Sequence, residues 1–290
     1  MKIAIIDSGI EVSHEAFKFI DMSNSYNFEA INSEIDDMEG HRTMVAGVIA
    51  GSKYNIGLAP NVSLLICKIT NTKSFKIHCM LRAFKYAINM NVDVINLSMT
   101  AYLNLKENDH VLKIMNDLIN EAKENNIIVV TSAGNHSINL EKNLLPHIPV
   151  SKQHENVLKI SATDINGDLA GYSNYGEVDF AAPCGKGFEE NIDSSNVILT
   201  TFPIKVNTMK SLQKNLGYKD GYVINYGTSL AAAHVSGAIG LIISHYLDLY
   251  KYKPEINTII EILKTEVPQK RKTSNFGYGE INVYNSLKSI

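Results

Sequence analysis

Four short segments of this chain contain residue types that together can carry out nucleophilic catalysis. They place Asp7, His41, Asn135 and Ser229 in that order along the sequence. Asp7 follows the apolar run at residues 2–6, which is typical of a buried strand, and catalytic groups gather at the carboxyl ends of strands in α/β folds. Ser229 stands at the predicted start of a helix of small residues, where free backbone N–H groups favour a nearby anion.

Taken singly, each of these segments also has an ordinary structural explanation. The sequence Asp-Ser-Gly from Asp7 onward is common in turns, and a lone histidine such as His41 is usually a packed structural residue. Asn135, just past a predicted strand, is typical of a turn, although its amide could also donate to a developing oxyanion. Thr228 or Ser229 could simply be a helix N-cap.

The combination resembles the motifs of the subtilisin-like serine proteases, the subtilase family. The family patterns Asp-Ser-Gly, His-Gly-Thr-His-Val-Ala-Gly and Gly-Thr-Ser-Met-Ala-x-Pro-His-Val are each matched in part, and aspartate, histidine and serine come in the subtilisin order. Further matches span nearly the whole chain and lie at residues 57–60, 93–98, 182–183 and 279–283.

The resemblance implies a role for each matching residue. Ser229 would be the nucleophile, His41 its general base, and Asp7 the carboxylate that orients the imidazolium. Asn135 and the backbone N–H of Ser229 would form the oxyanion hole. The substrate would pair as an added β-strand. The pocket for the side chain before the scissile bond would be bordered by Ser98, Met99, Thr100, Ser132, Ala133 and Gly134.

Four residues depart from the family pattern, one of them Met44, which stands where the family has a second histidine or another residue. Arg42 stands where the family usually has glycine, and a cation beside His41 would lower the basicity of the imidazole or contact an acidic substrate residue. Thr100 replaces a glycine of the pocket wall and is expected to narrow the pocket. Ala233 replaces a proline and should only restore a helical hydrogen bond, without loss of activity.

The segment at residues 49–56 is shorter than the calcium-binding loop of secreted relatives. Calcium takes six to eight oxygen ligands, and Lys53 adds a repelling charge. We therefore expect the family's strong calcium site to be missing, and we expect neither a metal nor a cofactor in the reaction.

Short apolar runs rich in valine and isoleucine alternate with helical periodicity along the chain. This alternation predicts an α/β fold, a single-domain doubly wound, mostly parallel sheet flanked by helices over residues 1–290. A long polar, irregular insertion is expected at residues 184–225. The apolar stretch at residues 235–244 is expected to lie in an amphipathic helix and to be too short to cross a bilayer. Strands are predicted at residues 2–6, 62–68, 92–97, 127–131 and 157–162, and helices at residues 78–90, 110–125 and in a segment with Pro254 in its first turn.

Composition narrows the class of protein. The chain has 290 residues, 45% of them hydrophobic, and a net charge of −3, so neither disorder nor nucleic acid as the main partner is expected. The three cysteines are widely spaced, without a zinc pattern, and their odd number excludes a complete disulfide framework. Free thiols fit a reducing compartment.

A protease without a signal peptide or pro-region is expected to fold and work in the cytoplasm, without contact to a membrane. Narrow specificity suits that setting, and the resemblance extends to the short cytoplasmic leader peptidases of lantibiotic biosynthesis, whose partner is a precursor peptide. The insertion at residues 184–225 would be a place to recognise a leader. The alternatives are a general intracellular subtilisin for protein turnover and a non-catalytic peptide-binding protein of the same fold. The oligomeric state is left open.

Overall fold

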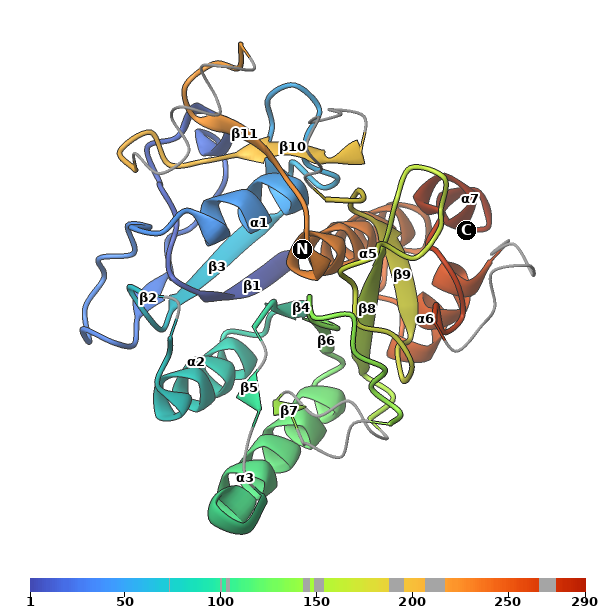
Figure 1. Cartoon of the computed structure of the whole chain (residues 1–290), viewed down its shortest axis with the longest axis horizontal. Coiled ribbons are helices and arrows are strands. Elements are labelled where there is room, and N and C mark those ends of the chain that lie inside the picture. Colours follow the sequence, from blue (N-terminus) through green and yellow to red (C-terminus); the bar gives the residue numbers. More distant parts are fainter. Residues whose placement is uncertain are drawn as a thin grey trace.

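The structure is a computed structural model that describes most of the chain. The residues described are 1–72, 74–99, 101–102, 105–142, 147–148, 154–187, 196–206, 217–265 and 275–290. The main sheet forms the middle of three layers, and helices form the layer on each of its two faces (Figure 1).

The central sheet contains seven parallel strands in the order β2-β3-β1-β4-β6-β8-β9. Strand order reverses beside β1, which pairs with β3 on one side and with β4 on the other. The prediction of a doubly wound parallel sheet is therefore confirmed, and the reversal lies where such folds place their sites. The strands are β1 (Lys2–Asp7), β2 (Tyr26–Asn27), β3 (Ser63–Lys68), β4 (Val94–Leu97), β6 (Ile128–Ser132), β8 (Val157–Thr163) and β9 (Phe180–Pro183).

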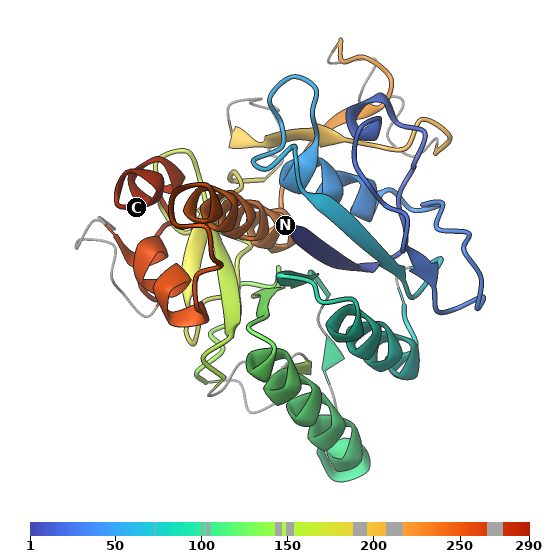
Figure 2. The ribbon, with the colours of Figure 1, turned by 180° about the vertical axis from the view of Figure 1, so that it is seen from behind.

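Each face of the sheet is covered by its own helices, which lie on opposite sides of the sheet in Figures 1 and 2. Alternate residues of β1 belong to different apolar clusters on the two faces of the sheet. Ile3 and Ile5 pack on the side of α1 (His41–Ala50) and α5 (Thr228–Tyr250). Ala4 and Ile6 pack on the side of α2 (Ile77–Asn89) and α3 (Leu105–Glu124). This period of two, with apolar residues on both faces, is what a fully covered parallel strand requires.

The remaining elements are short or lie at the margins of the sheet. They are the 3-10 helix η1 (Glu15–Phe17), the two-stranded pairs β5 (Ala101–Tyr102) with β7 (His147–Ile148) and β10 (Ile198–Thr201) with β11 (Tyr222–Asn225), and the helices α6 (Ile256–Lys264) and α7 (Val283–Lys288).

Helix α5 is the central core helix, and the prediction of an amphipathic helix at residues 235–244 is wrong. Of those ten positions only Leu241 and Ser244 are not fully buried. The helix is long and apolar enough to cross a membrane by length and composition, but 67% of its apolar window is buried inside the molecule. Its small residues allow this burial, since a Cβ at Gly237 would lie only 3.3 Å from the carbonyl oxygen of Ile49 in α1.

Two further expectations need correction. The insertion at residues 184–225 is not wholly irregular, because β10 and β11 form an antiparallel pair beside α1; its residues 188–195 and 207–216 lie outside the described part. The hydroxyl of Thr200 donates to the carbonyl of Met44 at 2.7 Å and ties this pair to α1. Helix α6 begins at Ile256, so Pro254 precedes the helix rather than lying in its first turn.

Candidate active site

The four candidate residues meet at the carboxyl edge of the central strands. Asp7 is the last residue of β1, His41 the first of α1, and Ser229 the second of α5. Asn135 follows β6 by three residues. Residues separated by more than two hundred positions are thus brought to one edge of the sheet because parallel strands all end there.

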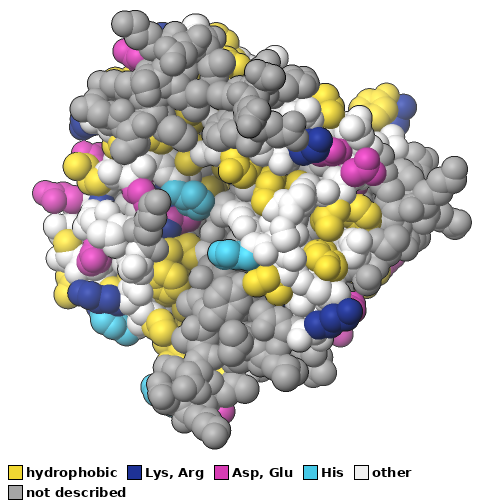
Figure 3. Space-filling model, viewed as in Figure 1, with side chains coloured by type: hydrophobic (Ala, Val, Ile, Leu, Met, Phe, Trp, Pro, Cys, Tyr) yellow, Lys and Arg dark blue, Asp and Glu magenta, His cyan; other side chains and the backbone are white. Residues whose placement is uncertain are grey.

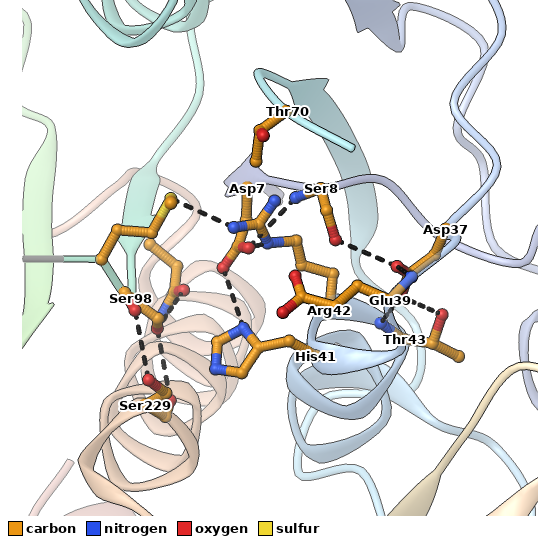
Figure 4. Close-up of polar contacts among 12 residues, drawn as sticks. Asp7, Ser8, Asp37, Glu39, His41, Arg42, Thr43, Thr70, Ser98 and Ser229 are labelled. Atoms are coloured by element: carbon orange, nitrogen blue, oxygen red, sulfur yellow. Dashed lines mark hydrogen bonds and ion pairs between the residues drawn. The ribbon is translucent and has the colours of Figure 1, made fainter. Parts of the chain in front are cut away.

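In Figure 4 the imidazole of His41 lies between the side chains of Asp7 and Ser229, with one ring nitrogen turned toward each of them. Nδ1 of His41 lies 3.3 Å from Oδ2 of Asp7, whose side chain is fully buried, while 33% of the His41 side chain is exposed. The backbone N–H of Ser8 donates to the other carboxylate oxygen of Asp7 at 3.0 Å. The carboxylate therefore holds Nδ1, which leaves Nε2 free on the side of Ser229.

Arg42 forms an ion pair with Asp7 as well. Its Nε contacts Oδ1 of Asp7, its Nη2 donates to the sulfur of Met99 at 3.1 Å, and its side chain is 3% exposed. The sequence predicted a cation beside His41; the structure places that cation on the carboxylate that His41 shares. Burial lowers the pKa of Arg42, and the ion pair with Asp7 offsets part of that cost.

A second buried carboxylate, Asp37, fixes the start of α1. Its Oδ1 accepts hydrogen bonds from the Ser8 hydroxyl at 3.0 Å and from the backbone N–H of Gly40 at 2.9 Å. Its Oδ2 accepts from the backbone N–H of Thr43 at 3.1 Å. Asp37 thus caps the helix that begins with His41. The sequence analysis missed it, although an acidic residue just before a helix start is a recognisable signal.

The surroundings of His41 act on its pKa in opposite directions. Burial of the imidazole lowers the pKa of His41, whereas the carboxylates of Glu39 and Asp37 raise it. Burial is the largest effect and favours the neutral imidazole, the form that can accept a proton.

Ser229 lies at the N-terminus of α5, where its hydroxyl joins a series of hydrogen bonds among buried polar groups. Its hydroxyl donates to the carbonyl of Ser98 at 3.1 Å, and the Ser98 hydroxyl donates to Oδ1 of Asn96 at 2.8 Å. Asn96 in turn donates to the hydroxyl of Ser236, which lies two helical turns after Ser229 in α5, at 2.8 Å. The end of β4 is thereby fastened to the first turns of α5.

The side chain of Asn135 is oriented by Thr228. Its Oδ1 accepts from the backbone N–H of Thr228 at 2.9 Å and from the Thr228 hydroxyl at 2.8 Å. Because a backbone N–H can only donate, Oδ1 must face Thr228, and Nδ2 is directed away from it as a donor. A Cβ at Gly227 would lie 3.3 Å from this Nδ2, and Gly227 has a φ of +128°, so glycine suits the position.

The N-cap explanation of Thr228 and Ser229 is wrong. The N-cap of α5 is Gly227, without a side-chain cap, and Thr228 is already the first helical residue. The Thr228 hydroxyl instead donates to Asn135 and accepts from the backbone N–H of Gly134 at 3.1 Å.

The residues expected to border the substrate pocket follow two neighbouring strands. Ser98 and Met99 come directly after β4, while Ser132 ends β6 and leads into Ala133 and Gly134. Because β4 and β6 pair in parallel, with Leu97 opposite Thr131, the two segments lie side by side. Thr100 lies outside the described residues, so its narrowing of the pocket stays a prediction.

A cavity of about 200 Å³ opens beside His41. On the face drawn in Figure 3, histidine and acidic side chains lie close together near the centre of the surface. The cavity places charges of both signs next to the imidazole, with apolar and hydroxyl groups opposite. It is lined by Glu39, His41, Arg42, Thr72, Phe75, Ser98 and Met99.

Within the described residues, no group of three or more histidine, cysteine, aspartate or glutamate side chains is placed to hold a metal ion.

A parallel α/β sheet with aspartate, histidine and serine in this arrangement, and an amide donor beside the serine, defines a hydrolase that works by acyl transfer. The chain belongs to the subtilase family, whose model matches residues 1–279. It is a subtilisin-like serine endopeptidase of the α/β class.

Known relatives include proteases of peptide maturation. The crystal structure of a lanthipeptide protease superposes with a TM-score of 0.90 at 30% identity and covers 100% of this chain and 87% of its own. The epidermin leader peptide-processing serine protease of Staphylococcus epidermidis is 28% identical over 99% of this chain and 69% of its own length. The major intracellular serine protease of Bacillus subtilis (strain 168) is 28% identical over 92% of this chain and 76% of its own length.

Proposed function

We propose that this protease removes the leader from a precursor peptide, with Ser229, His41 and Asp7 as the catalytic triad. The observation that carries the triad is the position of the His41 imidazole between Asp7 and Ser229, with Nδ1 toward a carboxylate oxygen and Nε2 on the side of the serine. The substrate class is supported by the similarity to a lanthipeptide protease over the whole chain and to an epidermin leader-processing protease over 99% of it.

The first half of the reaction transfers the acyl group to Ser229. The hydroxyl rotates from the Ser98 carbonyl toward His41, whose Nε2 takes its proton while Oγ attacks the scissile carbonyl. Asp7 stabilises the imidazolium through Nδ1–H. The oxyanion accepts hydrogen bonds from Nδ2 of Asn135 and from the backbone N–H of Ser229, which is free at the N-terminus of α5.

The second half releases both products. The C–N bond breaks as the imidazolium of His41 gives its proton to the leaving amine, and the acyl group stays on Ser229. Water then enters, loses a proton to His41 and attacks the ester, and the proton returns to Ser229 when the acid leaves. No step calls for a metal or a cofactor.

Narrow selectivity is supported by the charged cavity beside His41. Its wall combines the half-buried Glu39 with the buried Arg42, whose charge is already paired with Asp7, so a substrate side chain entering it must compensate the carboxylate of Glu39. Desolvating an unpaired charge there is costly, and this rejects sequences that do not match.

A library of ten-residue peptides, read out by mass spectrometry beside a β-casein digest, tests this specificity. We expect cleavage at one narrow consensus and largely intact casein. The second candidate, a general protease of protein turnover, is supported by the similarity to the intracellular protease of Bacillus subtilis. It would instead cut many library sequences and reduce casein to small fragments. Ser229→Ala is the control for contaminating proteases.

The pH profile of kcat/KM is expected to respond in opposite directions to the two charges beside His41. The acid limb follows the pKa of His41, because only the neutral imidazole accepts the serine proton. Glu39 raises this pKa, so Glu39→Gln should move the acid limb to lower pH. Arg42 shares the Asp7 carboxylate with His41. Arg42→Gln would leave this carboxylate to the imidazolium alone and should move the limb to higher pH.

The matched control for this profile is Glu34→Gln, which removes an exposed carboxylate of the same loop outside the cavity. Shifts in the same direction for Glu39→Gln and Arg42→Gln, or none, would contradict the assignment of His41 as the base.

The protease is proposed to act in the cytoplasm. All three cysteines are free and buried, which suits a reducing compartment. Detection of the native protein mainly in a secreted or membrane fraction would overturn this localisation.

A further inference from the structure

The buried side chain of Asn174 makes three hydrogen bonds to the backbone of the loop that carries Asn135. This residue lies in the segment between β8 and β9, is 0% exposed, and belongs to none of the motifs that identified the site. Its Oδ1 accepts from the backbone N–H groups of His136 at 3.0 Å and Ile138 at 2.9 Å. Its Nδ2 donates to the carbonyl of Ala133 at 2.9 Å.

These bonds are made to residues that precede and follow Asn135 in the sequence. The backbone N–H of Asn174 adds a fourth bond, to the carbonyl of Gly134 at 2.8 Å. Asn135 itself is exposed, so its own side chain cannot fix the course of the loop by packing. Gly134 has a φ of +103°, and a Cβ there would lie 2.5 Å from Nδ2 of Asn174, which shows how closely this amide approaches the loop.

Asn135 is therefore constrained by two different contacts. Thr228 fixes which end of the side-chain amide faces the site and also holds the backbone N–H of Gly134. Asn174 holds the loop backbone on both sides of Asn135. A hydrogen-bond donor stabilises an oxyanion only when it is held at the right position before the charge develops. A misplacement of about 1 Å can cost up to about a hundredfold in rate.

We propose that Asn174 is a positioning residue of the oxyanion hole, acting through the loop at residues 133–138 on the amide of Asn135. The inference rests on the proposed catalytic role of Ser229 and Asn135. It predicts a loss in the rate of the chemical step rather than in the affinity for substrate, and a loss that depends on the presence of the Asn135 amide.

Labelling of Ser229 by a fluorophosphonate probe measures this step without knowledge of the natural substrate. Asn174→Ala is expected to lower the maximal rate of labelling about tenfold while the half-saturating probe concentration stays within about twofold. In an Asn135→Ala background the same substitution should change the rate less than about twofold, since the amide to be positioned is gone.

Asn156→Ala is the matched control for lost stability. Asn156 is also 0% exposed and donates to two backbone carbonyls, those of Ile119 at 3.1 Å and Ile127 at 3.2 Å. It lies just before β8, at the opposite edge of the sheet from the site. Its replacement should lower Tm as Asn174→Ala does, yet leave the labelling rate unchanged at a temperature where both variants are folded.

Asn174→Asp serves as a second variant should the alanine variant not fold. It keeps an acceptor for the N–H groups of His136 and Ile138 but loses the donor to Ala133, so it too should label more slowly than wild type. A wild-type labelling rate in the folded variant, the same loss in both Asn135 backgrounds, or an equal loss in Asn156→Ala would overturn the positioning role. Absence of labelling in wild type would instead refute the triad itself, which keeps the two failures distinct.

Discussion

Replacing Ser229 with alanine is expected to lower kcat for peptide hydrolysis by about a millionfold, a magnitude known from subtilisin itself. The substitution removes the atom that forms the acyl-enzyme, the Ser229 hydroxyl at the N-terminus of α5. The measurement is kcat on the consensus peptide from the library, with the variant purified from a host free of serine protease activity.

The matched control is Ser244→Ala, which makes the same change further along α5, away from the site. It should leave kcat within about twofold, as substitutions remote from the site usually do. A Ser229→Ala variant that keeps more than about one per cent of wild-type turnover would contradict nucleophilic catalysis by this residue.

Replacing Asn135 with alanine is expected to lower kcat by about a hundredfold to a thousandfold, again the magnitude found for subtilisin, with little change in KM. Oδ1 of Asn135 is occupied by Thr228 at 2.9 and 2.8 Å, so only Nδ2 is available to the oxyanion. Because the charge develops only in the transition state, the loss should fall on kcat.

Asn139→Ala provides the control within the same loop. Oδ1 of Asn139 accepts from the backbone N–H of Glu141 at 3.0 Å, so this substitution removes a local turn contact without touching the site. It should leave both kinetic constants nearly unchanged. A rise in KM without a fall in kcat for Asn135→Ala would show that Asn135 binds substrate rather than stabilises the oxyanion.

The positions of the catalytic candidates could be predicted from sequence because each is tied to the end of a regular element. The apolar run before Asp7 is β1, and the small residues after Ser229 are the start of α5. Parallel strands end at one edge of a sheet, so once the strands are recognised the candidates must converge.

Contacts between distant segments could not be predicted in the same way. Asn174 contacts a loop 36 to 41 positions earlier in the chain, and nothing in its own neighbourhood distinguishes it from an ordinary loop asparagine. The ion pair of Arg42 with Asp7 depends on where the first turn of α1 lies relative to the end of β1, and no local sequence pattern encodes this placement.

Helix α5 shows why the amphipathic prediction was wrong. A stripe of small and apolar residues has the same appearance whether one face or the whole circumference is buried. The difference arises from the partners, since α5 packs against α1 as well as against the strands β4, β6, β8 and β9. The pairing of β10 with β11 was missed because half of β10, Thr200 and Thr201, is polar, and the hydroxyls of both residues donate to carbonyls of α1.

The most direct test of the central claim is the intact mass of wild type and Ser229→Ala after treatment with a fluorophosphonate probe. The arrangement of Asp7, His41 and Ser229 predicts one adduct on wild type and none on the variant, because only an activated serine reacts with the probe. No adduct on folded wild type, or the same adduct on both proteins, would contradict the triad and bring forward a peptide-binding role without catalysis.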